Sequence, residues 1–427
     1  MRLGGRAQAA IEVLEAWEGG GRPVSQCLAD WGRSHRFAGG GDRAAIGNLV
    51  YDALRRRLST AHAMGADDPR SLVLGVLLRE WGHAPQGLRE AFAGDRHAPE
   101  LPDDLALADR EPADHVRADL PEWVAPFFEG NFADDWVAEG VALAARPPLD
   151  LRANTLKATP AKVAKALRAS PGPTPIALHG LRVPPGEGPA RLPNVTADQA
   201  HAKGWFEVQD EGSQVVAELV YAQPGEQVMD FCAGSGGKTL ALAAAMENRG
   251  QIHAYDADRQ RLRPIHERLR RAGARNVQVH EPGGEGGADL SALVGRMDRV
   301  LVDAPCTGSG TWRRHPDTKW KLTSEALERR VEEQDEVLAQ AAPFVRPGGY
   351  LAYVTCSVLP VENEARVAAF LEDNASFELL SAGEVWQDLY GFEKPQPWSA
   401  DMMSVTLTPA STGTDGFFFA VMGRRDG

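Results

Sequence analysis

The stretch EQVMDFCAGSGGKTLALAAAM, residues 226–246, decides the fold of this chain. An apolar run of strand length is followed by a cluster of glycines and then by leucines and alanines typical of a helix. Glycine lets the backbone pass close to a ligand, and the positive end of a helix attracts anionic and polar groups. The stretch therefore predicts a strand, a ligand-binding loop and a helix, in that order.

The alternation of strand and helix continues beyond this stretch. We predict strands in QIHAYD, NVQVH, DRVLVDAP, YLAYVTCS and GFFFAVMGR, and helices between them in ADRQRLRPIHERLRRAG, SEALERRVEEQDEVLAQAAPFV and VENEARVAAFLED. This pattern is typical of an open, mostly parallel sheet with helices on both faces, which binds its ligand at the carboxyl ends of the strands. We therefore predict a Rossmann-like α/β domain over residues 204–427.

Two further domains are predicted before residue 204. AQAAIEVLEAW, DRAAIGNLVYDALRRRL and RSLVLGVLLREWG repeat apolar residues at helical spacing, which predicts a helical domain over residues 1–130. In the range 131–203, apolar and polar residues alternate around LRANTLK, which predicts a strand, and the residues after it predict a helix. We expect a small α+β module there, and three domains in all.

Composition limits the class of protein. With 43% apolar and 25% charged residues, the 427-residue chain is typical of a globular protein. No apolar run reaches the roughly 18 residues of a membrane span, and MRLGGRAQAAIEVLEAWEGGG lacks the apolar core of a signal peptide. We therefore expect a cytoplasmic protein that does not bind membranes. The net charge of −13 restricts any RNA contact to local basic patches.

The four cysteines, Cys27, Cys232, Cys306 and Cys356, are far apart and form no CxxC pair. This spacing argues against a disulfide scaffold and against a zinc site, so we expect reduced thiols and no metal.

The glycine loop CAGSGGKT superficially resembles a phosphate-binding P-loop. That motif would require a glycine where Cys232 stands, which argues against an ATPase. The next strand ends at Asp256, whose carboxylate could accept both hydroxyls of a ribose. The two features suit any adenosine-bearing cofactor, NAD or S-adenosylmethionine; a plain tight turn with a solvated helix cap is the alternative.

Two cysteines follow two neighbouring strands. Asp303 and Cys306 lie in DRVLVDAPCTGSG, and Cys356 lies in YLAYVTCS. A lone cysteine is usually a small core residue, but two at equivalent strand ends beside an aspartate favour reactive thiols. Methylation of cytosine at carbon 5 needs a thiolate to attack carbon 6, an acidic residue at the base edge and a group for the release step. Cys356, Asp303 and Cys306 would supply these three.

The sequence resembles the Sun family of RNA cytosine methyltransferases. The matching strings are LRANTLK, VQDEGSQ, MDFCAGSGGKT, DAPCTGSGTWRRHPDTKW, TCSVLPVENE and TDGFFFA, in the family's order, over about residues 145–422. The helical region before them weakly resembles the NusB-like domain of this family. The resemblance implies a class I S-adenosylmethionine-dependent fold and an RNA-binding role for the α+β module.

The resemblance also implies roles for individual residues. Cys356 would be the nucleophile, Cys306 would assist product release, and Asp303 would contact both cofactor and base. Asp256 would hold the cofactor ribose. The residues implied at the methionine end of the cofactor are Cys232, Ala233, Gly234, Ser235, Gly236, Gly237 and Lys238.

Three of the basic residues implied by the resemblance have simpler alternatives. Lys238 would point toward the active site, but it could also be a solvated lysine at a helix start. Arg313 and Arg314 would meet the RNA backbone, but they could also belong to a simple exposed basic loop.

The chain departs from the family pattern at two positions. Ser235 stands where the family has proline, and Gly283, in VHEPGGEGG, stands where it has an aspartate near the adenine. Glu281 is a candidate to replace that aspartate. We expect cofactor binding to survive the change at Ser235. At Gly283 the alternative to Glu281 is a weaker adenine contact, which would affect the affinity for the cofactor more than the chemistry.

Several functions compete with RNA cytosine methylation. The seven arginines of ADRQRLRPIHERLRRAGAR favour a solvated helix, whereas TWRRHPDTKWK is better placed to meet RNA. The rivals are a DNA cytosine methyltransferase, a small-molecule methyltransferase and a non-catalytic RNA-binding or antitermination protein. We predict a monomeric RNA cytosine-5 methyltransferase, with ribosomal RNA as the favoured substrate and transfer RNA second.

Overall fold

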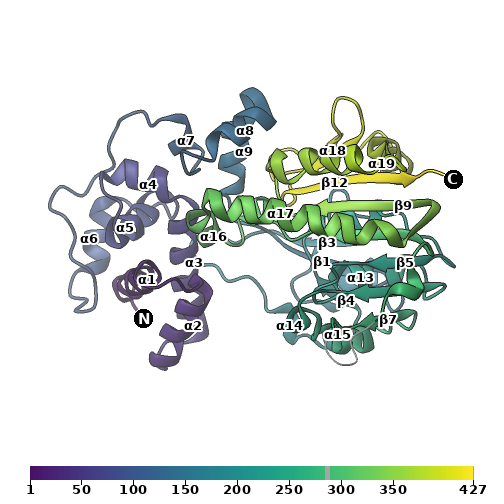
Figure 1. The fold of residues 1–427 in the computed structure, drawn as a ribbon. Coiled ribbons are helices and arrows are strands. Elements are labelled where there is room, and N and C mark those ends of the chain that lie inside the picture. Colours follow the sequence, from purple (N-terminus) through teal and green to yellow (C-terminus); the bar gives the residue numbers. More distant parts are fainter. Residues whose placement is uncertain (284–288, 427) are drawn as a thin grey trace. The chain divides into compact units, whose positions relative to one another are not determined.

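The computed structural model describes residues 1–283 and 289–426, and the chain forms two compact units (Figure 1). The first unit consists of Met1–Pro147, Pro185–Pro193 and Trp312–Lys321. The second consists of Pro148–Pro184, Asn194–Thr311 and Leu322–Gly427. Each unit is thus built from segments that are separate in sequence. The division into domains 1–130, 131–203 and 204–427 stays a prediction.

The first unit is helical. Its helices are α1 (Leu3–Glu18), α2 (Val24–Ser34), α3 (Gly40–Arg55), α4 (Arg57–Met64), α5 (Pro69–Arg79), α6 (Pro85–Phe92), α7 (Asp114–Arg117), α8 (Ala125–Phe132), α9 (Trp136–Leu143) and α16 (Pro316–Lys321), with a 3-10 turn η1 (Ala133–Asp135). The helical periodicity read from sequence is confirmed in α1, α3 and α5.

The core of this unit forms where α1, α3 and α5 bury their apolar sides together. Leu14, Leu49 and Leu77 are each at most 1% exposed. Helix α5 begins sharply because the Asp68 carboxylate accepts hydrogen bonds from two backbone N–H groups of its first turn, and Pro69 has a φ suited to that position.

Helix α16 joins this unit from far along the chain. Trp320 donates its indole N–H to the Leu54 carbonyl at 2.6 Å, and Lys319 donates to the Arg55 carbonyl at 3.2 Å. Arg55 in turn donates from Nε to the carbonyl of Arg313 at 2.6 Å. The loop TWRRHPDTKWK therefore enters the helical unit, although the sequence suggested that it belonged wholly to the α/β domain.

The second unit contains a small antiparallel sheet with strand order β2-β3-β1-β4. The strands are β1 (Leu149–Ala153), β2 (Gly172–Pro173), β3 (Gly180–Val183) and β4 (Phe206–Val208), accompanied by α10 (Pro160–Ala166), η2 (Val195–Ala197) and α11 (Gln199–Ala202). The predicted α+β character is present. Asn154, in LRANTLK, donates to the carbonyls of Gly204 and Ala272, both at 2.8 Å, so this motif joins the small sheet to the helix that ends at Ala272.

The same unit contains an eight-stranded sheet among the described residues, ordered β10-β12-β9-β8-β5-β6-β7 with β11 beside β12. Its strands are β5 (Gln227–Asp230), β6 (Gln251–Tyr255), β7 (Val277–His280), β8 (Met297–Asp303), β9 (Val345–Thr355), β10 (Phe377–Leu380), β11 (Ser404–Leu407) and β12 (Phe417–Arg424). Strands β5 to β9 pair in parallel, and β12 pairs antiparallel with β9. This confirms the mostly parallel, Rossmann-like sheet.

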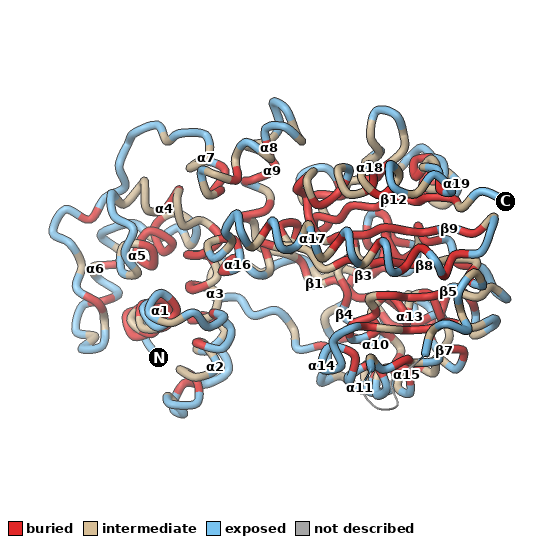
Figure 2. Tube along the Cα trace, viewed as in Figure 1, coloured by how far each residue is buried: buried red, intermediate tan, exposed pale blue. Residues whose placement is uncertain are grey.

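Helices cover both faces of this sheet. They are α12 (Glu211–Leu219), α13 (Gly237–Ala245), α14 (Arg259–Leu262), α15 (Ile265–Ala272), α17 (Ser324–Ala341), α18 (Glu364–Asp373) and α19 (Ala382–Tyr390), with short turns η3 (Ser291–Leu293), η4 (Ser309–Thr311), η5 (Ala342–Phe344) and η6 (Pro360–Glu362). Figure 2 shows β8 and β9 in the middle of the sheet, and residues 300–302 of β8 and 351–355 of β9 are buried between these layers.

Successive side chains of a strand point to opposite faces of the sheet, which explains why helices pack on both faces. On β12, Phe417 and Phe419 pack in the cluster that includes α12, α13 and α19, whereas Phe418 packs in the cluster that includes α17 and α18. Strand order reverses between β8 and β5, because β6 and β7 lie on one side of β5 and β8 and β9 on the other. Open sheets bind ligands at the carboxyl ends of the strands at such a reversal.

Candidate functional site

The glycine loop lies between β5 and α13, at this reversal point. Gly234 and Gly236 have φ values of +49° and +87°, a region that residues with a Cβ seldom adopt. A Cβ on Gly236 would also lie 2.5 Å from a side-chain carbon of Ile265. The glycines are thus required by the path of the loop, and helix α13 begins directly behind it.

Asp256 closes the loop from the end of β6. Its carboxylate is buried and accepts hydrogen bonds from the Gly234 and Asp258 N–H groups, both at 2.8 Å. Asp230, at the end of β5, accepts from the Thr239 hydroxyl at 2.7 Å, and burial, together with the charge of Asp303, raises its pKa to about 7. Three acidic side chains therefore surround the loop.

The predicted cysteines come together. The Sγ atoms of Cys306, after β8, and Cys356, after β9, lie 3.2 Å apart. The hydrogen bond with Cys356, burial and the negative charges of Cys356 and Glu362 raise the pKa of Cys306 well above its usual value. Burial, with the carboxylates nearby, also raises the pKa of Cys232, in the glycine loop.

Lys238 and Asp303 form an ion pair beside the thiols. Lys238 Nζ lies 2.7 Å from Asp303 Oδ2, and its side chain is only 8% exposed. Burial disfavours the ammonium, but the charge and hydrogen bond of Asp303 outweigh it and raise the pKa of Lys238, with a further contribution from Cys356. Of the two readings of Lys238, the structure favours the inward-pointing one over the solvated lysine.

The backbone keeps the two cysteine loops close. Gly310 donates its N–H to the Cys356 carbonyl at 3.0 Å, and Gly416 donates to the Gly310 carbonyl at 2.8 Å. A Cβ on Gly310 would lie 2.2 Å from the Gly416 carbonyl oxygen, so only glycine fits there. A Cβ on Gly416 would lie 2.5 Å from the Gly310 Cα, which explains the glycine in TDGFFFA.

Sequence reasoning missed Glu362. Its fully buried carboxylate accepts hydrogen bonds from Thr307, Ser357 and Gln334, which ties together the loops that follow the two cysteines. The available signal was an acidic residue two positions after the TCSVLP segment, in VENE.

The predicted RNA contacts lie in the loop that enters the helical unit, and the adenine-site departure follows β7. Arg313 is 4% exposed and Arg314 is partly exposed, and both belong to the helical unit. Glu281, the candidate substitute near Gly283, is paired with Arg259 at 2.8 Å. Their roles remain predictions.

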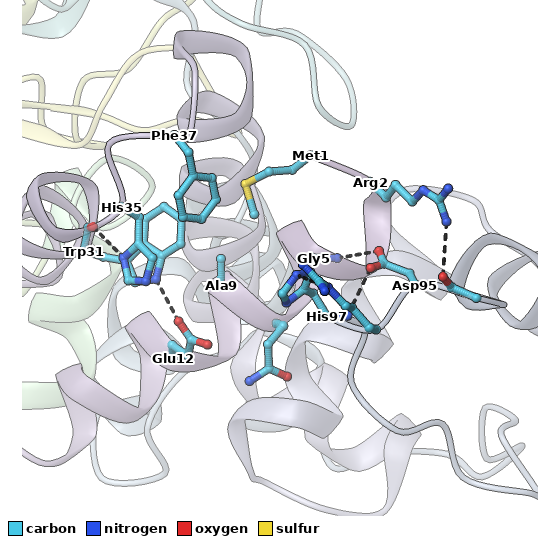
Figure 3. Close-up of a pocket in the computed structure, with 13 residues that line it drawn as sticks. Met1, Arg2, Gly5, Ala9, Glu12, Trp31, His35, Phe37, Asp95 and His97 are labelled. Atoms are coloured by element: carbon cyan, nitrogen blue, oxygen red, sulfur yellow. Dashed lines mark hydrogen bonds between the residues drawn. The ribbon is translucent and has the colours of Figure 1, made fainter.

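A separate hollow of about 610 Å³ lies in the helical unit (Figure 3). Trp31 stacks on His35 there, with ring centroids 4.2 Å apart, and donates its indole N–H to Glu12 at 2.9 Å. Phe37, also on its wall, is 73% exposed. We predicted no role for these residues from sequence.

The described residues contain neither a membrane-spanning helix nor a metal-binding group. No helix formed by residues 1–283 or 289–426 is both long and apolar enough to cross a membrane. Within the same described ranges, no group of three or more His, Cys, Asp or Glu side chains could hold a metal ion.

Solved structures resemble this chain in fold. The crystal structure of a methyltransferase homolog protein from Pyrococcus horikoshii is 27% identical, with a TM-score of 0.58 over 73% of this chain and 97% of that chain. The structure of NSun6 from the same organism with SFG is 20% identical, with a TM-score of 0.61 over 72% of this chain and 99% of that chain. Both support the Rossmann-like methyltransferase fold.

Sequence relatives identify the family. The chain is 34% identical over 308 residues to a probable ribosomal RNA small subunit methyltransferase B from Synechocystis, an alignment that covers 70% of this chain. It spans 66% of the relative, slightly less than two thirds of its length. Residues 217–423 match the family model described as 16S rRNA methyltransferase RsmB/F. The chain therefore belongs to the RsmB/F family, in agreement with the resemblance of its motifs.

Proposed function

We propose that this chain is an S-adenosylmethionine-dependent RNA methyltransferase that modifies carbon 5 of cytosine. Ribosomal RNA is the favoured substrate, because the relative at 34% identity is a probable ribosomal RNA methyltransferase, and transfer RNA is second. The observation that carries the proposal is the pair of thiols, Cys306 and Cys356, 3.2 Å apart after neighbouring strands. A protein that only bound RNA would have no need of such a pair.

The residues around the glycine loop fit S-adenosylmethionine. The loop offers a close backbone approach at Gly234 and Gly236, and acidic side chains at Asp256 and Asp303 for the ribose and the positively charged methionine end. The NSun6 relative in fold was solved with SFG, an analogue of this cofactor. When bound, the cofactor supplies an electrophilic methyl group. Cys232, Ala233, Ser235, Gly237 and Lys238 complete the proposed contacts.

In the proposed reaction, the Cys356 thiolate attacks carbon 6 of cytosine, and the electron pair displaced from the ring double bond makes carbon 5 nucleophilic. The ammonium of Lys238, ion-paired with Asp303, supplies positive charge beside the reacting groups, while Asp303 binds the base edge. Once carbon 5 carries the methyl group, Cys306 assists loss of the carbon 5 proton, the ring double bond re-forms and Cys356 leaves as a thiolate.

The proposed RNA contacts are spread over several parts of the chain. We place RNA contacts on the small β1–β4 module and on Arg313 and Arg314, and we infer a NusB-like role for the helical unit. Because Arg313 is 4% exposed, contact through Arg314 is the more accessible of the two. Reversing the charge at Arg314 should weaken RNA binding and reduce its salt dependence.

The test compares wild type, Cys356→Ala and Cys306→Ala with S-adenosylmethionine and cellular RNA, followed by denaturing gels and nucleoside analysis. Wild type should form 5-methylcytosine, Cys356→Ala should lose both methylation and adducts, and Cys306→Ala should accumulate a covalent RNA adduct. Parallel reactions with DNA and free nucleosides separate the competing substrates. Retention of 5-methylcytosine by Cys356→Ala would show that the nucleophile is misassigned.

A further inference from the structure

Glu362 forms a bridge between the two cysteine loops. Thr307 directly follows Cys306 and donates to Glu362 from its N–H at 2.8 Å and from its hydroxyl at 2.6 Å. Ser357 directly follows Cys356 and also donates its hydroxyl to Glu362. One carboxylate is therefore bonded to the neighbours of both reactive thiols.

The bridge is deeply buried and well satisfied. Glu362 is 0% exposed, and Gln334, from helix α17, gives its carboxylate a fourth donor at 3.0 Å. A buried carboxylate is costly unless its oxygens are hydrogen-bonded, and bonds to a charged acceptor are stronger than neutral ones. Removing the acceptor would leave buried donors unpaired on both loops.

Neighbouring hydrogen bonds also hold the two cysteine loops together. The hydroxyls of Ser309 and Ser357 lie 2.9 Å apart, and Val358 donates its N–H to Ser309 at 2.9 Å. Tyr353 donates its hydroxyl to the backbone carbonyl of Glu362 at 2.7 Å, which anchors the turn to β9. Glu362 supplies the carboxylate of this network.

We propose that Glu362 is a positioning residue that holds Cys306 and Cys356 at the separation their shared reaction requires. The inference deepens the proposed function, because it concerns the same thiol pair. The side-chain hydrogen bonds of Glu362 come from Thr307, Ser357 and Gln334, so it acts through the cysteine loops rather than on the cofactor. Its negative charge also opposes ionisation of Cys306, which contributes to the raised pKa of that thiol.

The test uses Glu362→Gln, which keeps the side-chain shape but replaces one acceptor oxygen with a donor. Glu372→Gln, on the exposed side of α18, is the matched control. Phenylarsine oxide is the probe of thiol separation, because its arsenic bonds to two nearby sulfurs with release of water. Thermal melting establishes that each variant is folded.

We expect Glu362→Gln to bind phenylarsine oxide at least about tenfold more weakly than wild type, because two-point binding depends on the orientation of both thiols. Alkylation of Cys306 by iodoacetamide should shift to lower pH, and kcat for RNA methylation should fall while the Kd for S-adenosylmethionine stays unchanged. Glu372→Gln should match wild type in every measurement.

A folded Glu362→Gln with wild-type arsenical binding and an unchanged Cys306 alkylation profile would overturn the proposal. If that variant does not fold, Thr307→Val and Ser357→Ala each remove one hydroxyl donor of the bridge, and wild-type arsenical binding in both would overturn the proposal equally. Arsenical binding needs no RNA, so a chain that methylates no RNA would refute the proposed function while leaving this inference to its own test.

Discussion

Arg268 donates from one guanidinium nitrogen to both the carbonyl and the hydroxyl oxygen of Ser235, at 3.0 and 2.7 Å. Its other terminal nitrogen donates at 3.0 Å to Glu207, on β4 of the small sheet. Ser235 is the loop residue that stands where the family has proline. A side-chain clamp in this chain thus restrains a position that a proline ring would otherwise stiffen.

This clamp predicts that Arg268→Met weakens binding of S-adenosylmethionine by about two- to tenfold, the range expected for loss of partly exposed hydrogen bonds worth about 0.5–1.5 kcal/mol. Isothermal titration would measure the change. Arg270→Met, on the exposed side of α15, is the control and should leave the affinity unchanged. Equal affinities in the two variants would mean that the clamp does not organise the loop.

The Lys238–Asp303 ion pair predicts a loss in the chemical step. Either Lys238→Met or Asp303→Asn should lower the single-turnover rate of methyl transfer by about a hundredfold or more, because each removes a charge beside the developing reaction. The double variant should be little worse than the singles, since the two side chains act as a pair. Lys165→Met, on an exposed position of α10, is the control for charge alone. Additive losses would argue for independent roles.

Glu218 predicts a specific pH dependence of stability. Burial raises its pKa from 4.5 to about 7, despite hydrogen bonds from Tyr390 and Leu178 that oppose the shift. The folded chain then holds a proton that the unfolded chain releases, so this group's stabilising contribution is lost as pH rises from about 4.5 through 7.

Glu218→Gln should remove that decline. As pH rises between these values, the free energy of unfolding of the variant should increase relative to that of wild type by at most about 3 kcal/mol. Urea denaturation at a series of pH values would measure the difference. Parallel curves for the two proteins would show that Glu218 does not titrate in this range.

The burial of Trp312 predicts that the segment Trp312–Lys321 stabilises the helical unit. Trp312 is 1% exposed and stacks on Phe128 with ring centroids 6.1 Å apart. Trp312→Ala should cost about 3–5 kcal/mol, as expected for truncation of a buried aromatic residue. Phe37→Ala, whose side chain is 73% exposed, should change stability far less. Calorimetry of the two variants would decide, and similar melting curves would contradict the prediction.

Local signals predicted the parts of the fold that depend on local chemistry. Gly234 and Gly236 marked the loop because their backbone conformations need glycine, and the strand ends before Cys306 and Cys356 placed both thiols at one edge of the sheet. Glu362 escaped notice because two of its donors, Thr307 and Gln334, lie 55 and 28 residues away along the chain. Hydrogen bonds of that kind have no spacing rule.

The sequence also did not predict that α16 packs in the helical unit. Trp312 and Trp320 are apolar and amphipathic residues that any core or RNA surface could use, so their identity does not say which core receives them. Only the contacts, such as the Trp320 bond to the Leu54 carbonyl, reveal that the helical unit does.

The discontinuous make-up of the helical unit has a consequence for protein synthesis. Its first 147 residues leave the ribosome well before Trp312–Lys321 exist, so the nascent helices lack the tryptophan-bearing strip that later packs on them. The unit reaches its final stability only after strands β5 to β8 of the large sheet have been made. An expression fragment that stops near Pro147 would carry that vacancy permanently and should aggregate more readily than the full chain.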